Sequence, residues 1–120
     1  MEKAAVEKAF RDFLRYLRVE RNYSAHTVRN YESDLRQFVL FLDERGEQQS
    51  VSASQALVPT EVGHLDVRAY LASLYRRNAK SSVARKLSCL RSFFGYLVRQ
   101  GEIKQNPADM VSAPKMVRLL

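Results

Sequence analysis

Two short stretches of the chain place hydroxyl side chains beside basic ones at the start of a helical pattern. In the stretch KSSVARK, Lys80, Arg85 and Lys86 accompany Ser81 and Ser82. Arginine and lysine bind phosphate through charge-assisted hydrogen bonds, and arginine also pairs with base edges in the major groove. The free N–H groups and the dipole at a helix start add to the attraction for an anion. The chemistry predicted here is the binding of a phosphate or of a base edge.

The second stretch follows Ser24, a candidate helix N-cap whose hydroxyl can accept from a free backbone N–H. The side chains of His26, Thr27, Arg29 and Asn30 come next. We expect the two helix starts to lie on one side of the folded chain and to form a joint cationic surface. The pattern leaves an alternative open, in which the serine and threonine side chains only cap and the arginines are solvated.

The net charge favours an anionic partner without identifying it. The chain has 120 residues, with 20 Lys and Arg against 13 Asp and Glu, which gives a net charge of +7 and a pI of about 9.9. A small domain with this excess attracts polyanions, although a solvated, mildly basic surface stays the alternative from charge alone. Apolar residues make up 46% of the chain, enough for one globular domain with its own core.

Several kinds of catalytic and metal site have no signal in the sequence. The four glycines are scattered, so there is no Gly-rich phosphate loop, and no Cys/His cluster has zinc spacing. None of the six tyrosines has a surrounding set of Arg and His that would make it a nucleophile. We therefore expect no catalytic residue, no metal and no cofactor. Cys89 is predicted to be a buried thiol in a reducing compartment. The lack of an apolar run of about 20 residues predicts a soluble, cytoplasmic protein with no membrane partner.

Apolar residues recur with helical period in four segments, which predicts an all-α fold. The predicted helices cover about residues 2–20, 25–45, 64–77 and 81–100. The residues predicted to face inward are Val6, Phe10, Phe13, Leu14 and Leu17, then Val28, Tyr31, Leu35, Phe38 and Leu42, then Leu65, Ala69, Leu71 or Ala72, and Leu74 or Tyr75, and finally Val83, Leu87, Leu90, Phe94, Leu97 and Val98.

Capping residues and breakers predict where these elements begin and end. Thr60 or Gly63 is expected to cap the third helix and Ser81 or Ser82 the fourth, with Gly46 and Gly101 just past the second and fourth. The Asn106-Pro107 pair predicts a short fifth helix. Residues 47–59 are predicted to be a loop. We assign residues 1–111 to one domain and 112–120 to the start of a linker, since Pro114 and the apolar MVRLL indicate that the natural protein continues.

Two longer stretches resemble a known family. YSAHTVRNYESDLRQFVLFLDERG resembles the lSxxTxxxYxxDLxxFxxFL segment of tyrosine site-specific recombinases, the phage-integrase family. SSVARKLSCLRSFFGYLVRQGEIKQNPADMVSAPK resembles the S-x-x-R-x-L-S-x-L-R-x-F segment of that family with its NPA and PK motifs, and is similar in particular to the XerC-type branch. The resemblance implies a SAM-like four-helix bundle, the N-terminal core-binding domain, which forms half of a clamp around double-stranded DNA at a recombination half-site.

The resemblance also implies site residues by matching position. The implied DNA contacts are His26, Thr27, Arg29, Asn30, Lys80, Ser81, Ser82, Arg85, Lys86 and Arg91. Arg91 matches the LR of the family motif and is implied either to contact phosphate or to hold the bundle together. The catalytic arginines, lysine, histidines and nucleophilic tyrosine of the family have no counterpart here. The chain is therefore expected not to be an enzyme by itself, although its full-length parent would be a tyrosine recombinase.

For that parent, the resemblance implies a XerD-like partner recombinase, a tetrameric synapse with further copies of itself, and the resolution of chromosome dimers at dif-like sites during cell division. Two alternatives stay open. The chain is the core-binding domain of a phage or integron integrase, or it is a helical protein-interaction module whose basic face is incidental.

Overall fold

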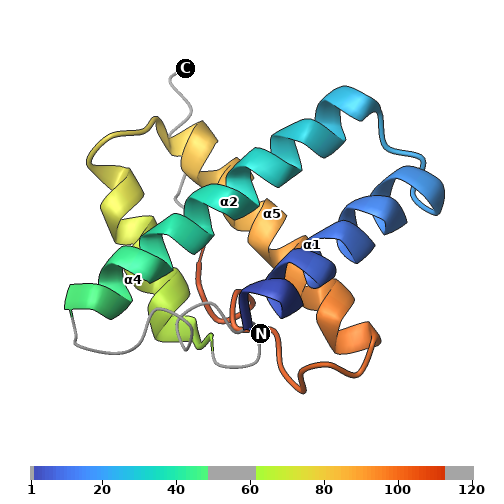
Figure 1. Ribbon diagram of the computed structural model, residues 1–120. Helices are drawn as coiled ribbons and strands as arrows, with labels where there is room; N and C mark the ends of the chain where they lie inside the picture. Colours follow the sequence, from blue (N-terminus) through green and yellow to red (C-terminus); the bar gives the residue numbers. More distant parts are fainter. Residues whose placement is uncertain (1, 49–61, 113–120) are drawn as a thin grey trace. The chain divides into compact units, whose positions relative to one another are not determined.

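A computed structural model describes residues 2–48 and 62–112 of the chain (Figure 1). The described residues form four helices and no strand: α1 (Glu2–Val19), α2 (Ala25–Gln48), α4 (His64–Tyr75) and α5 (Lys80–Arg99). The all-α prediction is confirmed. Most of the predicted loop, the candidate cap Thr60 and nearly all of the predicted linker lie outside the described residues.

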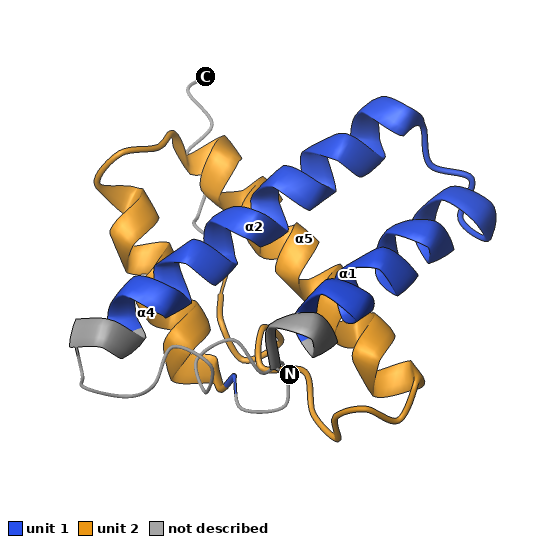
Figure 2. Cartoon of the chain, viewed as in Figure 1, with its two compact units in different colours: residues 1–62 blue, residues 63–120 orange. Residues whose placement is uncertain are grey.

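The chain divides into two compact units, Met1–Val62 and Gly63–Leu120 (Figure 2). Unit 1 contains α1 and α2, which run antiparallel and are joined by a short turn (Figure 1). Unit 2 contains α4, α5 and the segment that follows α5. The predicted assignment of residues 1–111 to one domain, with a linker from residue 112, stays a prediction.

The helices of unit 1 are amphipathic, and their apolar faces are buried. The buried apolar residues are Val6, Phe10, Phe13 and Leu17 of α1, and Leu35, Phe38 and Leu42 of α2. Leu14, Val28 and Tyr31, also predicted to face inward, are half-buried. Burial of these faces supplies the main stabilisation of the helices, because removing apolar area from water is favourable. The helix α2 continues past its predicted end, so Gly46 lies inside it and not after it.

The turn between α1 and α2 is closed by backbone hydrogen bonds. Asn22 has a φ of 55°, in the left-handed region that asparagine tolerates better than most residues. The N–H of Tyr23 donates to the carbonyl oxygen of Leu17 at 2.9 Å, which ends α1. The N–H of Thr27 donates to the hydroxyl of Ser24 at 3.1 Å. The predicted N-cap at Ser24 is therefore confirmed, and it fixes where α2 begins.

The buried face of α4 differs in part from the prediction. The buried residues of α4 are Val67, Tyr70, Leu71 and Leu74. Leu65 was predicted to face inward, but 58% of it is exposed. The reason is rotational, because Leu65 lies two residues before Val67 and so about 200° around the helix. Gly63 is the N-cap, as predicted, and its N–H donates to the Asp66 carboxylate at 2.9 Å.

The helix α5 buries the predicted stripe and more. The buried apolar residues are Val83, Leu87, Cys89, Leu90, Phe93, Phe94 and Leu97, and Val98 is half-buried. Burial of the Cys89 thiol is thereby confirmed. The predicted cap at Ser81 or Ser82 is wrong. The N-cap is Ala79, and both serines lie in the first turn of the helix.

The helix α5 ends as the sequence predicted. Gly101 has a φ of 76°, which glycine adopts at little cost. The N–H of Glu102 donates to the carbonyl of Leu97 at 2.9 Å, and the N–H of Gly101 donates to that of Val98 at 3.0 Å. This pair of bonds is the Schellman motif, which satisfies carbonyls at the end of the helix.

The short fifth helix predicted from the Asn-Pro pair does not form, and turns take its place. The N–H of Asp109 donates to the carbonyl of Asn106 at 3.2 Å, and the N–H of Val111 donates to that of Ala108 at 3.3 Å. The guanidinium of Arg91 also donates hydrogen bonds to the carbonyls of Ala108 and Val111. Carbonyls that would accept bonds in a continuing helix are therefore engaged by a side chain of α5, which favours turns.

Candidate nucleic-acid interface

The positive charge of the chain is concentrated in unit 2. Its sequence contains 11 Lys and Arg but only 3 Asp and Glu, whereas unit 1 contains 9 and 10. The segment from Val67 to Gly101 contains eight basic residues and no acidic one. The net charge is therefore +8 in unit 2 and −1 in unit 1. The field of unit 2 attracts polyanions, and that of unit 1 does so only where its own charges are unevenly distributed.

The start of α5 displays several of these basic side chains. Lys80, Ser81 and Arg85 are exposed and Ser82 is half-buried. The N-cap is an alanine, so no side chain caps the free N–H groups of the first turn. Free N–H groups at a helix start bind anions readily, more so beside a lysine. Lys80, Ser81 and Arg85 are therefore accessible to a ligand and Ser82 is partly so, while the DNA contacts implied for these four residues stay predictions.

Arg76 and Arg77 extend the basic surface, and the sequence reasoning missed them. Both are exposed in the turn between α4 and α5, and neither forms an ion pair or a side-chain hydrogen bond with a described residue. The signal was present, because a pair of arginines directly precedes the tight connection into the basic helix. Their charge is therefore available to a ligand of unit 2.

Lys86 is not part of this exposed surface. Only 5% of the residue is exposed, so the prediction that it projects away from the core is wrong. Lys86 lies three residues after Val83 and four before Leu90, both of which are buried. Residues three and four apart share a helix face, so Lys86 lies on the flank of the apolar stripe.

Arg91 ties the segment after α5 to the helix. Its Nε donates to the carbonyl of Ala108 at 3.3 Å, and its guanidinium also donates to the carbonyl of Val111. Asn106 donates to the carbonyl of Arg91 at 3.0 Å and accepts from the N–H of Ala108 at 2.9 Å. These contacts join α5 to the segment that follows it, so the implied role of holding the bundle together stays a prediction. A phosphate contact by Arg91 stays a prediction.

The start of α2 is a second polar surface, in unit 1. His26 and Arg29 are exposed, and Thr27 and Asn30 are half-buried. The Thr27 hydroxyl accepts from the Ser24 hydroxyl at 2.9 Å. Asn30 Nδ2 lies 3.4 Å from His26 Nε2, where the amide can donate to a neutral ring. Arg29 has no hydrogen bond or ion pair with any described residue, so its charge is free to meet a ligand.

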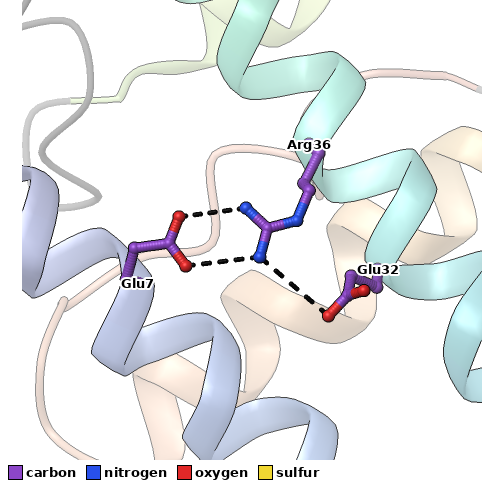
Figure 3. A network of polar contacts seen from close by, with 3 residues as sticks. All are labelled: Glu7, Glu32 and Arg36. Atoms are coloured by element: carbon purple, nitrogen blue, oxygen red, sulfur yellow. Dashed lines mark hydrogen bonds and ion pairs between the residues drawn. The ribbon is translucent and has the colours of Figure 1, made fainter.

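Arg36 shows the opposite behaviour on the same helix (Figure 3). Its guanidinium donates to both carboxylate oxygens of Glu7, at 2.9 and 3.3 Å, and lies 4.0 Å from the carboxylate of Glu32. The hydrogen bond from Arg36 lowers the pKa of Glu7 below its usual range, and the same bond raises the pKa of Arg36. Arg36 therefore links α1 to α2 and is neutralised, whereas Arg29 is not.

That the starts of α2 and α5 share one side of the molecule stays a prediction.

Among the residues that the structure describes, no group of three or more His, Cys, Asp or Glu side chains is placed to hold a metal ion. No helix within the described ranges is both long and apolar enough to cross a membrane.

Comparison with known proteins identifies the family. Residues 10–101 match the family described as phage integrase, N-terminal SAM-like domain. The chain is 40% identical over 111 residues to "Tyrosine recombinase XerC" of Syntrophus aciditrophicus, covering 92% of this chain and 35% of that protein. It is 45% identical over 109 residues to the protein of that name from Halalkalibacterium halodurans, covering 90% and 33%. It is 41% identical over 116 residues to that of Listeria innocua, covering 95% and 34%.

The chain spans about a third of the length of these curated relatives. No solved structure matches it. The family match begins in α1, runs through α2 and α4, and ends at Gly101, the residue that terminates α5. An all-α chain that matches over this range belongs to the phage integrase family, as its N-terminal SAM-like domain.

Proposed function

We propose that this chain is the DNA-binding domain of a tyrosine recombinase and that it binds duplex DNA through the starts of α2 and α5. The main support is the charge of unit 2, where eight basic and no acidic residues occur between Val67 and Gly101. Neutralising DNA phosphates releases condensed counterions, which favours binding by such a surface. The exposed position of Lys80 and Arg85 supports α5 as the helix that meets the duplex.

In unit 2, contacts to phosphate and to bases fall to different residues. Arg76, Arg77 and Lys80 are at the turn before α5 or in its first position, which suits contacts to the phosphate backbone. Arg85 is five residues into the helix, about 7.5 Å further along its axis. The major groove is about 12 Å wide and admits a helix, so a side chain at that depth reaches base edges. Arg85 is therefore the proposed base-reading residue of α5, with Ser81 and Ser82 beside it.

In unit 1, the start of α2 carries the second set of contacts. Arg29 suits a guanine edge or a phosphate, and Asn30 suits an adenine edge. His26 and Thr27 precede them by one turn and lie near the N-cap, where they suit phosphate. Lys86 is left out of the proposed contacts because it is buried.

For the whole parent protein we propose site-specific recombination at a dif-like site in the cytoplasm, with a XerD-like partner in a tetrameric synapse, resolving chromosome dimers at cell division. The relatives named XerC support this role. Strand cleavage would belong to residues outside this chain. A core-binding domain of a phage or integron integrase is the second candidate, supported by the family description itself.

A salt series of DNA binding tests the proposal. Fluorescence anisotropy follows a labelled duplex of about 20 base pairs, roughly two helical turns, as the chain is added. Between about 50 and 200 mM salt, log K should fall linearly, by about 0.9 per neutralised phosphate for each unit of log salt. Arg85→Ala should weaken binding by about 1–3 kcal/mol if Arg85 reads a base edge.

Lys104→Ala is the matched control for Arg85→Ala. Lys104 is an exposed basic residue of the same unit, beyond the opposite end of α5, so the variant removes the same charge away from the proposed site. We expect its affinity to stay within about twofold of the wild type, since a distant charge is screened. A flat salt response, with Arg85→Ala binding as the wild type does, would instead favour a protein-interaction module.

A further inference from the structure

Arg21 is held at the turn between α1 and α2 by aromatic side chains. Its guanidinium carbon lies 5.6 Å from the centre of the Tyr23 ring, and Tyr16 also lies near its side chain. The Tyr23 ring meets that of Tyr31 edge to face, with centres 5.8 Å apart, and the Tyr16 ring stacks on that of Phe13 at 6.5 Å. Phe13 is fully buried, so this aromatic cluster connects an exposed guanidinium to the core of unit 1.

This support orders Arg21 without neutralising it. No ion pair joins Arg21 to a carboxylate of the described residues. Arginine is protonated at neutral pH in any surroundings, and the interaction with Tyr16 raises the pKa of Arg21 further above its usual range. A guanidinium already stacked on a ring loses less conformational entropy when it binds than a free one does. Arg36 on α2 is ordered too, but by the Glu7 carboxylate, which cancels its charge.

Arg21 also lies at the basic end of unit 1. Residues 15–30 contain four arginines and one acidic residue, Glu20, whereas residues 31–48 contain five acidic and two basic residues. Arg15 and Arg18, on the last turns of α1, are exposed and have no ion pair with a described carboxylate. Although unit 1 has a net charge of −1, its charge is therefore uneven, and the positive part is at the turn that leads into α2.

We propose that Arg21, assisted by Arg18, binds a backbone phosphate of duplex DNA next to the start of α2. The inference rests on the proposed function of α2. Phosphate backbone flanks a helix that enters the major groove, so a turn leading directly into that helix lies over phosphate. The planar fork of arginine matches two phosphate oxygens. Arg21 thus adds affinity that is independent of sequence and orients α2 in the groove.

The same anisotropy titration, with Arg21→Ala and Arg21→Lys, tests this inference. Arg21→Ala should lower the steepness of log K against log salt by about 0.9, the contribution of one phosphate, and weaken binding equally on two duplexes of unrelated sequence. Arg21→Lys keeps the charge and loses the fork, so its slope should equal that of the wild type while its affinity is lower. Far-UV circular dichroism checks that both variants keep the helices.

Lys8→Ala is the control, because Lys8 is a basic residue of the same unit, on α1, but is paired with Asp12 at 2.9 Å. Its slope should match that of the wild type. If the wild type binds and Arg21→Ala has an unchanged slope of log K against log salt, Arg21 does not contact a phosphate. This inference then fails while the proposed function stands. If the wild type binds no duplex at any salt concentration, the proposed function fails first. Equal affinity for polyglutamate and for the duplex would overturn the assignment to phosphate in favour of an acidic protein.

Discussion

The side-chain amide of Asn106 donates to the backbone carbonyl of Arg91 at 3.0 Å, and Arg91 in turn donates to two carbonyls that follow Asn106. The two residues are 15 positions apart, and this reciprocal contact joins the last described segment to the side of α5. The helix α5, which we propose reads DNA, is thereby bonded to the segment that follows it. The contact also explains why an Asn-Pro pair starts turns here and not a helix.

Asn106→Ala should lower the free energy of unfolding by about 1–3 kcal/mol, because the N–H of Ala108 loses its acceptor and the carbonyl of Arg91 loses its bond from the side chain. Asn106→Asp keeps the acceptor for Ala108 and loses the donor to Arg91, so its loss should be intermediate. Urea denaturation followed by circular dichroism measures both. An Asn106→Ala midpoint equal to that of the wild type would show that the contact contributes nothing.

Two glycines of unit 2 should respond to alanine in opposite directions. In Gly95→Ala the new Cβ meets Asn106 Nδ2 at 3.6 Å and Arg99 Nη1 at 3.7 Å, ordinary contact distances, so the variant should gain about 0.5–1 kcal/mol of helix stability. Gly101→Ala forces alanine to a φ of 76° and should lose roughly 1 kcal/mol or more. Thermal melts of the two proteins compare the signs. A change of melting temperature in the same direction for both variants would contradict the roles assigned to Gly95 inside α5 and to Gly101 at its end.

The ion pair between Glu7 and Arg36 should make stability depend on pH. The bond from Arg36 lowers the pKa of folded Glu7, so its contribution is present above the ordinary glutamate pKa of about 4.3 and is lost as pH falls through the folded value. Both side chains are about half exposed, at 48% and 49%, so the contribution is at most about 1 kcal/mol.

Urea midpoints of the wild type and Glu7→Gln, compared at about pH 7 and about pH 3, should differ only at the higher pH. Glu20→Gln is the control, since Glu20 is exposed and has no ion pair with a described residue. A Glu7→Gln difference that persists in acid would mean that Arg36 stabilises unit 1 by packing and not by charge.

The N-cap of α5 allows stability to be separated from DNA binding. Ala79 lacks a side-chain acceptor, so Ala79→Ser and Ala79→Asp should each stabilise the chain by about 0.5–2 kcal/mol. The aspartate also places a negative charge beside Lys80, where we propose that phosphate binds. Ala79→Asp should therefore bind the duplex more weakly than Ala79→Ser does, by about tenfold if one phosphate contact is lost, or 1.4 kcal/mol. Equal affinity of the two variants for the duplex would mean that DNA does not bind at the start of α5.

Local sequence signals predicted the helices well. The spacing of Val6, Phe10, Phe13 and Leu17 was sufficient for α1, because the amphipathic period depends only on neighbours within two turns. Ser24 as the start of α2 and Gly101 as the end of α5 were predictable for the same reason, since a cap bonds to backbone two to five residues away.

Features that depend on distant residues were not predictable from these signals. Arg36 and Arg29 are both arginines of α2 off its apolar stripe, and nothing local separates them, because the partner Glu7 of Arg36 lies 29 residues away. The Asn-Pro pair favours a helix start, but the contacts with Arg91 favour turns there instead. Lys86 carries a charge that suggests exposure, yet its position on the flank of the α5 stripe buries it. Arg21 gave no signal, because its tyrosine partners meet it only once the turn has folded.

The most direct test of DNA binding by both helix starts is to map a duplex onto the backbone amides of the chain, which at 13.9 kDa suits heteronuclear NMR. With a ¹⁵N-labelled chain and an unlabelled duplex, the amides of residues 21–30 and 76–85 should shift or broaden together as DNA is added. Those of residues 36–45, in the acidic half of α2, and of residues 95–104 should stay in place. Shifts confined to the second pair of segments, or to only one of the two helix starts, would contradict the claim that both helix starts bind the duplex.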